Sequence, residues 1–137
     1  MSVGGQVTGA VGLGLCVLVG VGREDCEEDA RWVADKVVTL RVFEDEQGKM
    51  NRSVLDVHGG LLAISQFTLF GDARKGTRPG FVDAAPPEIA QPLYARFCKL
   101  ARESGVQVAE GVFRATMQVR IVNEGPVTLL LDSKRLF

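Results

Sequence analysis

Helical spacing of apolar residues occurs in only two stretches of this chain, and this feature most limits the folds open to it. The first stretch predicts a helix over residues 26–40. Its apolar stripe consists of Ala30, Val33, Ala34, Val37 and Leu40. The second stretch predicts a helix within residues 86–105 that ends at a glycine cap, Gly105. Its stripe consists of Ile89, Leu93, Phe97 and Leu100.

Two residues bear on where these helices begin. Asp25, followed three positions later by Glu28, has the arrangement of a capping box and is the expected N-cap of the first helix. Pro92 interrupts the second pattern, and a proline in a helix interior costs ~3 kcal/mol. The second helix is therefore expected either to begin near Gln91 or to have kinked first turns.

The other apolar residues lie in short runs typical of β-strands. Residues 15–21, "LCVLVGV", and residues 61–67 have the apolar density of buried strands. Gly4-Gly5 predicts a hairpin turn, and a polar turn is expected around Gly48.

The last third of the chain is expected to complete the sheet. Residues 116–121 alternate between polar and apolar side chains, which predicts a half-buried strand. Residues 127–133, "VTLLLDS", would then close the sheet as a buried strand. Because strands outnumber helices and do not alternate regularly with them, we predict one α+β domain over residues 1–137. Its core would be a largely antiparallel (mixed), barrel-like sheet with two main helices.

Composition narrows the classes of function. A formal net charge of −1 argues against binding nucleic acid through bulk charge, and no DNA partner is expected. The three cysteines have no C-x-x-C spacing, so Cys16 and Cys98 are expected to be core thiols in a reduced, cytoplasmic protein. The apolar N-terminal stretch lacks a basic flank and predicts a strand, so no membrane association is expected. The single histidine, His58, lies in a turn-like "VHGG", and no metal or cofactor is expected.

Two polar segments next to apolar runs are the candidate sites. "SQFTL", residues 65–69, ends a predicted strand with polar residues, at a point where main-chain N–H groups become free to bind a ligand. "NEGPVT", residues 123–128, contains more than a turn requires. Taken separately, each segment is also compatible with an ordinary strand end or turn.

Taken together, the two segments resemble the S-Q-x-x-L and N-x-G-P-x-T motifs of the D-aminoacyl-tRNA deacylase family. The resemblance extends over "GLCVLVGV", "DKVVTLRVFEDEQGKMN", "SQFTLFGDARKGTRPGF", "DAAPPE" and "MQVRIVNEGPVTLLLDS". Members of this family are homodimers that hydrolyse the ester between tRNA and a D-amino acid, and they accept glycine on alanine tRNA. The resemblance implies the same activity, a tRNA substrate and a homodimer for this chain.

The resemblance also implies roles for the residues of both motifs. The catalytic segment would consist of Ser65, Gln66, Phe67 and Thr68. Chiral rejection would involve Leu69, Asn123, Gly125, Pro126 and Thr128. A cis Gly-Pro pair would enter the active site of the partner subunit, where main chain would occupy the volume that an L side chain needs. The leucines after Thr128 would anchor this tip in a buried strand.

The resemblance leaves open how the ester is cleaved. One mechanism uses main-chain N–H donors for the oxyanion, with help from the 2′-hydroxyl of the terminal adenosine. The competing mechanism uses Thr68 as nucleophile, although no base is apparent in the sequence to activate it. We favour the RNA-assisted mechanism. Arg74, Lys75 and Arg78 make the following loop locally basic, either to contact tRNA phosphates or as a solvated surface.

Departures from the family pattern keep other interpretations open. The first strand of the family is expected to be shortened or missing here, because "SVGGQV" follows Met1 almost at once. A related animal deacylase edits L-alanine on threonine tRNA, but Ser65 before Gln66 argues against it. A non-enzymatic dimer that binds nucleic acid or a protein on the same fold is the alternative from another class.

Overall fold

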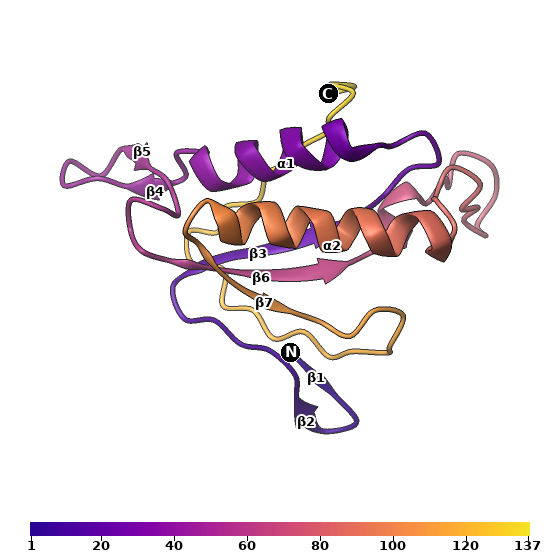
Figure 1. The fold of residues 1–137 in the computed structure, drawn as a ribbon, viewed down its shortest axis with the longest axis horizontal. Helices are drawn as coiled ribbons and strands as arrows, with labels where there is room; N and C mark the ends of the chain where they lie inside the picture. Colours follow the sequence, from indigo (N-terminus) through magenta and orange to yellow (C-terminus); the bar gives the residue numbers. More distant parts are fainter.

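Helical crossovers make the central sheet parallel. The computed structural model describes residues 1–137 (Figure 1). The sheet has the order β3 (Gly14–Val19), β6 (Gly60–Ser65), β7 (Gln107–Glu110), and both pairings are parallel. Helix α1 (Glu27–Thr39) lies between β3 and β6 in the chain, and α2 (Pro87–Glu103) lies between β6 and β7.

The expectation of a largely antiparallel core is therefore wrong, whereas the α+β class with two main helices is confirmed. Each helix returns the chain to the same end of the sheet, so the three central strands run in one direction. This sheet has two free edges and does not close into a barrel. Antiparallel pairing is confined to small hairpins and isolated bridges.

Two glycine turns form the expected hairpins. Strands β1 (Ser2–Val3) and β2 (Gln6–Val7) flank Gly4-Gly5, whose φ angles are +55° and +81°. Positive φ at both central residues is typical of a tight hairpin turn. Strands β4 (Phe43–Glu44) and β5 (Met50–Arg52) flank the turn at Gly48.

Residues 111–137 form no strand of the central sheet, contrary to both expectations for residues 116–121 and 127–133. Its one bridge joins Gln118 to Ser2, with two N–H···O bonds of 2.9 Å. The alternation along residues 111–120 is real, since every second residue is half-buried. Leu129 and Leu130 are exposed, and Leu131 alone of the three leucines packs against the main core. The described chain supplies no neighbouring strand that would bury them.

Both helices form close to the predicted bounds. The N-cap of α1 is Cys26 and not Asp25, because the Asp29 carboxylate accepts the Cys26 N–H at 2.9 Å and completes the capping box. Helix α2 begins at Pro87 and runs through Pro92, so the expected late start near Gln91 is wrong. Pro92 removes a hydrogen bond to the carbonyl of Glu88, an exposed residue of the first turn.

Side chains pack on both faces of the central sheet. Figure 1 shows α1 and α2 on one face of the sheet, and the N-terminal hairpin with the orange run that follows β7 on the other. The yellow C-terminal end of the chain returns to the helical side, beyond α1. The helical face contains Leu61, Phe97 and Cys98, and the buried Tyr94 hydroxyl donates to the Ala63 carbonyl at 2.8 Å. The second face contains Leu62, Ile64, Met1, Cys16, Met117 and Val119. Cys98 is thus a core thiol as predicted, and Cys16 is half-buried.

The helices are short compared with a lipid bilayer. At 17 residues α2 is the longest. Neither it nor α1 combines the length and apolarity needed to traverse a membrane.

Candidate active site at the end of strand β6

The SQFTL segment lies where two parallel strands end together. Ser65 closes β6 and pairs with Val19, the last residue of β3. The Gln66 N–H then donates to the Val19 carbonyl at 2.8 Å, and the chain turns into the 3-10 helix η1 (Phe67–Phe70). Parallel pairing therefore places the predicted catalytic segment at the carboxyl edge of the sheet, beside the residues that follow β3.

Helix η1 exposes main-chain donors on the surface. The N–H groups of Phe67 and Thr68 open this helix, and the first N–H groups of a helix have no acceptor within it. They take part in no loop or side-chain hydrogen bond of the structure. Phe67, Thr68 and Leu69 are all exposed. The segment can thus offer N–H groups to an oxygen atom of a ligand.

The side chains of the segment support this conformation. The Gln66 amide Nε2 donates to the Thr68 hydroxyl oxygen. The Phe67 ring packs edge-on against Phe81, with 5.1 Å between ring centroids. No imidazole contacts Thr68, because His58 precedes the other end of β6, ~20 Å away for six strand residues. For the mechanism that uses Thr68 as nucleophile, the structure therefore places no histidine beside the hydroxyl.

A glycine loop after β3 packs against η1 and was not predicted from the sequence. A Cβ atom at Gly20 would lie 3.1 Å from the Phe70 ring and 3.3 Å from the Gln66 carbonyl oxygen. The Gly22 N–H donates to the Asp25 carboxylate at 2.7 Å, which fixes the loop to the start of α1. Glycines at the end of an apolar strand were the available sequence signal for this close approach.

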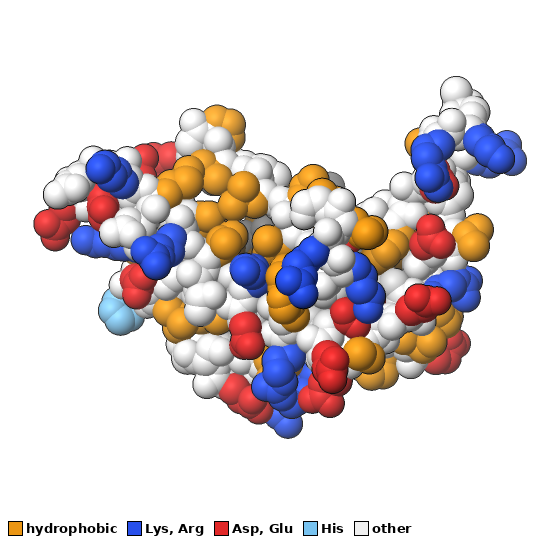
Figure 2. Space-filling view, turned by 90° about the horizontal axis from the view of Figure 1, so that it is seen from above, with side chains coloured by type: hydrophobic (Ala, Val, Ile, Leu, Met, Phe, Trp, Pro, Cys, Tyr) orange, Lys and Arg blue, Asp and Glu red, His pale blue; other side chains and the backbone are white.

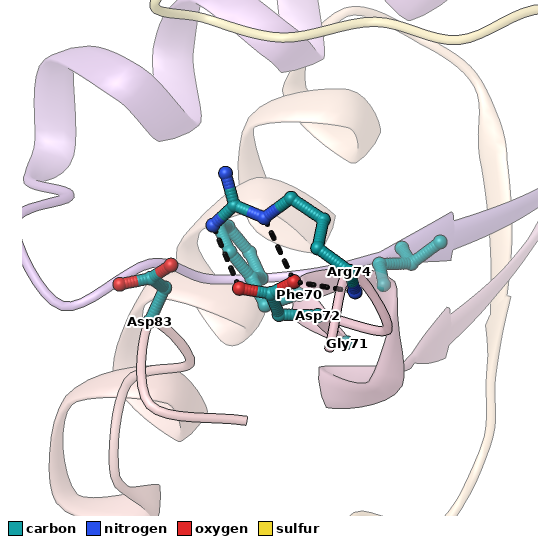
Figure 3. Close-up of a pocket in the computed structure, with 6 residues that line it drawn as sticks. Phe70, Gly71, Asp72, Arg74 and Asp83 are labelled. Atoms are coloured by element: carbon teal, nitrogen blue, oxygen red, sulfur yellow. Dashed lines mark hydrogen bonds and ion pairs between the residues drawn. The ribbon is translucent and has the colours of Figure 1, made fainter. Parts of the chain in front are cut away.

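A shallow cavity of about 260 Å³ opens beside η1. It is lined by Leu69, Phe70, Gly71, Asp72, Arg74 and Asp83 (Figure 3). Arg74 binds Asp72 through two side-chain bonds of 2.9 and 2.7 Å. These bonds hold the pKa of Asp72 at about 2. Asp83, which follows the loop of residues 71–80 in the chain, also lines the cavity and was not predicted from the sequence.

The three residues predicted to contact tRNA phosphates differ in whether an acidic side chain already pairs with them. Arg74 is held by Asp72, whereas Lys75 and Arg78 are exposed and form no ion pair. Figure 2 shows lysine and arginine side chains on the segment that projects at this end of the molecule. A local basic surface thus exists next to the cavity, with two unpaired cations.

The NEGPVT segment forms an exposed loop at the other end of the sheet. The Asn123 carboxamide accepts the Val127 N–H at 3.0 Å and donates to the Thr128 hydroxyl at 3.1 Å, which closes the loop. The Gly125–Pro126 peptide bond is cis. In Figure 1 this loop follows the orange run beneath the sheet and lies near the start of β6. No hydrogen bond joins it to residues 65–69 of the same chain.

Comparisons with known proteins give the class of this protein. Residues 1–132 match the family described as D-Tyr-tRNA(Tyr) deacylase. A D-aminoacyl-tRNA deacylase of Anaeromyxobacter dehalogenans (strain 2CP-C) is 63% identical over 135 residues, or 98% of this chain and 91% of that one. One of Thermotoga petrophila (strain ATCC BAA-488 / DSM 13995 / JCM 10881 / RKU-1) is 58% identical over 132 residues, or 96% and 89%.

Solved structures agree with the fold. The structure titled "c-Myc DNA Unwinding Element Binding Protein" superimposes with a TM-score of 0.87 at 41% identity, covering 93% of this chain and 87% of that one. A "probable eukaryotic D-amino acid tRNA deacylase" gives a TM-score of 0.64 at 17% identity, over 77% and 76%, and shows the fold alone.

The chain therefore belongs to the deacylases, hydrolases that act on an ester bond. More particularly, the chain is a member of the D-Tyr-tRNA(Tyr) deacylase family, matched over nearly its full length. The resemblance read from the two motifs is confirmed.

Proposed function

We propose that the protein hydrolyses the ester between a D-amino acid and the terminal adenosine of tRNA. The observation that carries this is the identity of 58–63%, over nearly the whole chain, to relatives named D-aminoacyl-tRNA deacylase. The exposed end of β6 supports it, because main-chain donors lie beside open surface there. Release of D-tyrosine from D-tyrosyl-tRNA by the purified protein, measured against a buffer control, tests the assignment.

The chemistry requires little from side chains. Water attacks the ester carbonyl carbon, negative charge grows on the carbonyl oxygen, and the bond to the 3′-oxygen of adenosine then breaks. The N–H groups of Phe67 and Thr68 are suited to receive that charge, and preorganised donors of this kind are a large catalytic term. The adjacent 2′-hydroxyl of the substrate would carry the proton between the attacking water and the leaving oxygen. The products are a free amino acid and tRNA.

Replacing Thr68 by alanine should leave most of the activity. The Thr68 hydroxyl accepts a hydrogen bond from Gln66 and contacts no group that would remove its proton. We expect kcat for D-tyrosyl-tRNA to stay within about tenfold of the unmodified value, since losing a true nucleophile costs several orders of magnitude. Thr68→Ser is the matched control, because it retains a hydroxyl. Loss of activity in Thr68→Ala with retention in Thr68→Ser and normal folding of both would establish Thr68 as the nucleophile.

Selection against L-amino acids would come from main chain donated by a second copy of the protein. Gly125 and Pro126 of one protomer would enter the partner's site and occupy the volume of an L side chain. A D side chain would point away from this wedge, and glycine has no side chain to collide with it. Glycine esterified to alanine tRNA would therefore also be a substrate, as the family resemblance implies.

The surface around the NEGPVT loop supports a homodimer. Val122 is 97% exposed and Leu130 is 71% exposed, on either side of the loop, and Ile121 and Leu129 are exposed as well. Large apolar side chains exposed on both sides of one loop are compatible with an interface. The loop also lies far from residues 65–69 of its own chain (Figure 1), so a second copy is needed to bring the two motifs together.

Neutralising the basic loop should weaken substrate binding more than catalysis. We expect Lys75→Ala/Arg78→Ala to raise KM for aminoacyl-tRNA and to reduce the slope of log KM against log salt by about one for each side chain that had bound a phosphate. Lys49→Ala in the β4–β5 turn, at the other end of the molecule, removes an exposed cation as a matched control. An unchanged KM and salt slope in the double variant would show that the loop does not contact tRNA.

A second candidate function is binding of nucleic acid without catalysis. It is favoured by the 41% identity to a structure whose title names DNA-element binding. The net charge of −1 gives no general attraction to a polyanion, so such binding would depend on the local basic loop. Tight binding of DNA by a protein that does not deacylate D-tyrosyl-tRNA would favour this alternative.

A further inference from the structure

Near the C-terminus, Lys134 forms ion pairs with two aspartates at the start of α1, Asp25 and Asp29. The Lys134 ammonium lies 3.0 and 3.1 Å from the two carboxylate oxygens of Asp29 and 3.8 Å from an oxygen of Asp25. These two aspartate side chains are only 13% and 19% exposed. The ion pairs join residues more than 100 positions apart in the chain. They are thus a tertiary contact between the tail and α1.

Each of the two carboxylates also holds main chain in place. Asp29 accepts the Cys26 N–H and caps α1. Asp25 accepts the Gly22 N–H of the loop that packs on η1. Burial raises the pKa of Asp25, and the nearby charge of Asp29 acts in the same direction. The Lys134 ammonium acts in the opposite direction and lowers the pKa of both carboxyl groups.

Lys134 lies close in the sequence to the loop that contains Gly125 and Pro126. It follows the NEGPVT loop by six positions in the chain. Leu131 packs against the main core, whereas Leu129 and Leu130 are exposed. Asp132 then accepts the Lys134 N–H at 2.9 Å in a turn that presents the lysine side chain to α1. The stem after the Gly125–Pro126 tip is therefore fixed to its own protomer at Leu131 and at Lys134.

We propose that Lys134 is a positioning residue for stereoselectivity, which fixes the stem of the Gly125–Pro126 tip by binding Asp29 and Asp25. The inference rests on the proposed function, in which that tip excludes L side chains from the partner's site. Lys134 does not touch the substrate. Its removal frees the stem, and displacement of a selecting group by about 1 Å is enough to change rates by orders of magnitude.

The test compares Lys134→Met, Lys134→Arg and Arg135→Met. Methionine keeps the length and removes the charge, and arginine retains the ion pairs. Arg135 is the neighbouring cation and forms no ion pair, so Arg135→Met controls for charge loss in the tail. We expect the ratio of kcat/KM for D-tyrosyl-tRNA over L-tyrosyl-tRNA to fall about tenfold or more in Lys134→Met. The other two variants should keep the unmodified ratio.

An unchanged ratio in Lys134→Met, or an equal fall in Arg135→Met, would overturn the positioning role. Hydrogen exchange separates this result from a failure of the proposed function, since it needs no substrate. Faster exchange of the N–H groups of residues 127–134 in Lys134→Met alone supports the tether even if the unmodified protein shows no deacylation. Equal exchange in all forms of the protein would refute the tether itself.

Discussion

A D-tyrosyl-tRNA that ends in 2′-deoxyadenosine is expected to be cleaved about 10²-fold or more slowly than the ribose substrate, as is typical for loss of a group that transfers a proton. Neither Thr68, which accepts a hydrogen bond from Gln66, nor His58, which lies beyond the other end of β6, is placed to take this role. The 2′-hydroxyl would be the one proton carrier next to the ester. Single-turnover rates at saturating protein measure the effect on the chemical step.

Binding of the same two substrates is the control for this result. If the 2′-hydroxyl acts in proton transfer, both RNAs should bind with similar Kd, and the loss should appear in the rate constant alone. Comparable single-turnover rates for the deoxy and ribose substrates would contradict RNA-assisted catalysis. A side-chain mechanism would then have to be reconsidered, beginning with Thr68.

Replacing Gly125 by alanine is expected to produce the other large effect. Gly125 has a φ of +135°, and a Cβ atom there would lie 2.9 Å from Cγ2 of Val127, so the loop must move to accept it. We expect the preference for D-tyrosyl-tRNA over L-tyrosyl-tRNA to fall by about 10²-fold, because the selecting main chain would be displaced. The ratio of the two kcat/KM values is the measurement.

Gly48→Ala separates this effect from general backbone strain. Gly48 also has a positive φ, +75°, but a Cβ atom there would meet nothing within 4 Å, and its turn is remote from both motifs. Each substitution costs stability on the order of 1–3 kcal/mol through its backbone conformation. Equal D-over-L ratios in both variants and in the unmodified protein would show that Gly125 has no part in stereoselection.

Local sequence patterns predicted the individual elements well. The stripe of α1 gave a helix over 26–40 against the observed Glu27–Thr39, because apolar periodicity and an acidic first turn are local properties. The apolar runs before Gly20 and before Ser65 are β3 and β6. Strand direction was predicted wrongly, because it depends on pairing between distant residues. The position of the N-cap was wrong by one residue, since Asp29 and not Glu28 reaches back to the cap.

The part of the candidate site that consists of consecutive residues could be predicted from the sequence. The residues that other segments contribute through folding could not. Ser65–Thr68 was identified from its motif, whereas Gly20, Phe81 and Asp83 reach the site through tertiary packing. The C-terminal run shows the same limit. Its alternation correctly indicated one buried face, which packs on the central sheet through Met117 and Val119. No strand of the chain covers the exposed Val122 and Leu130, which the homodimer proposed above would bury.

The most direct measurement of the central claim compares D-tyrosyl-tRNA with L-tyrosyl-tRNA under identical conditions. The purified protein is expected to release D-tyrosine rapidly and to leave the L-ester at its spontaneous rate of hydrolysis. Cleavage of both esters at the same rate would contradict stereoselection by the Gly125–Pro126 main chain.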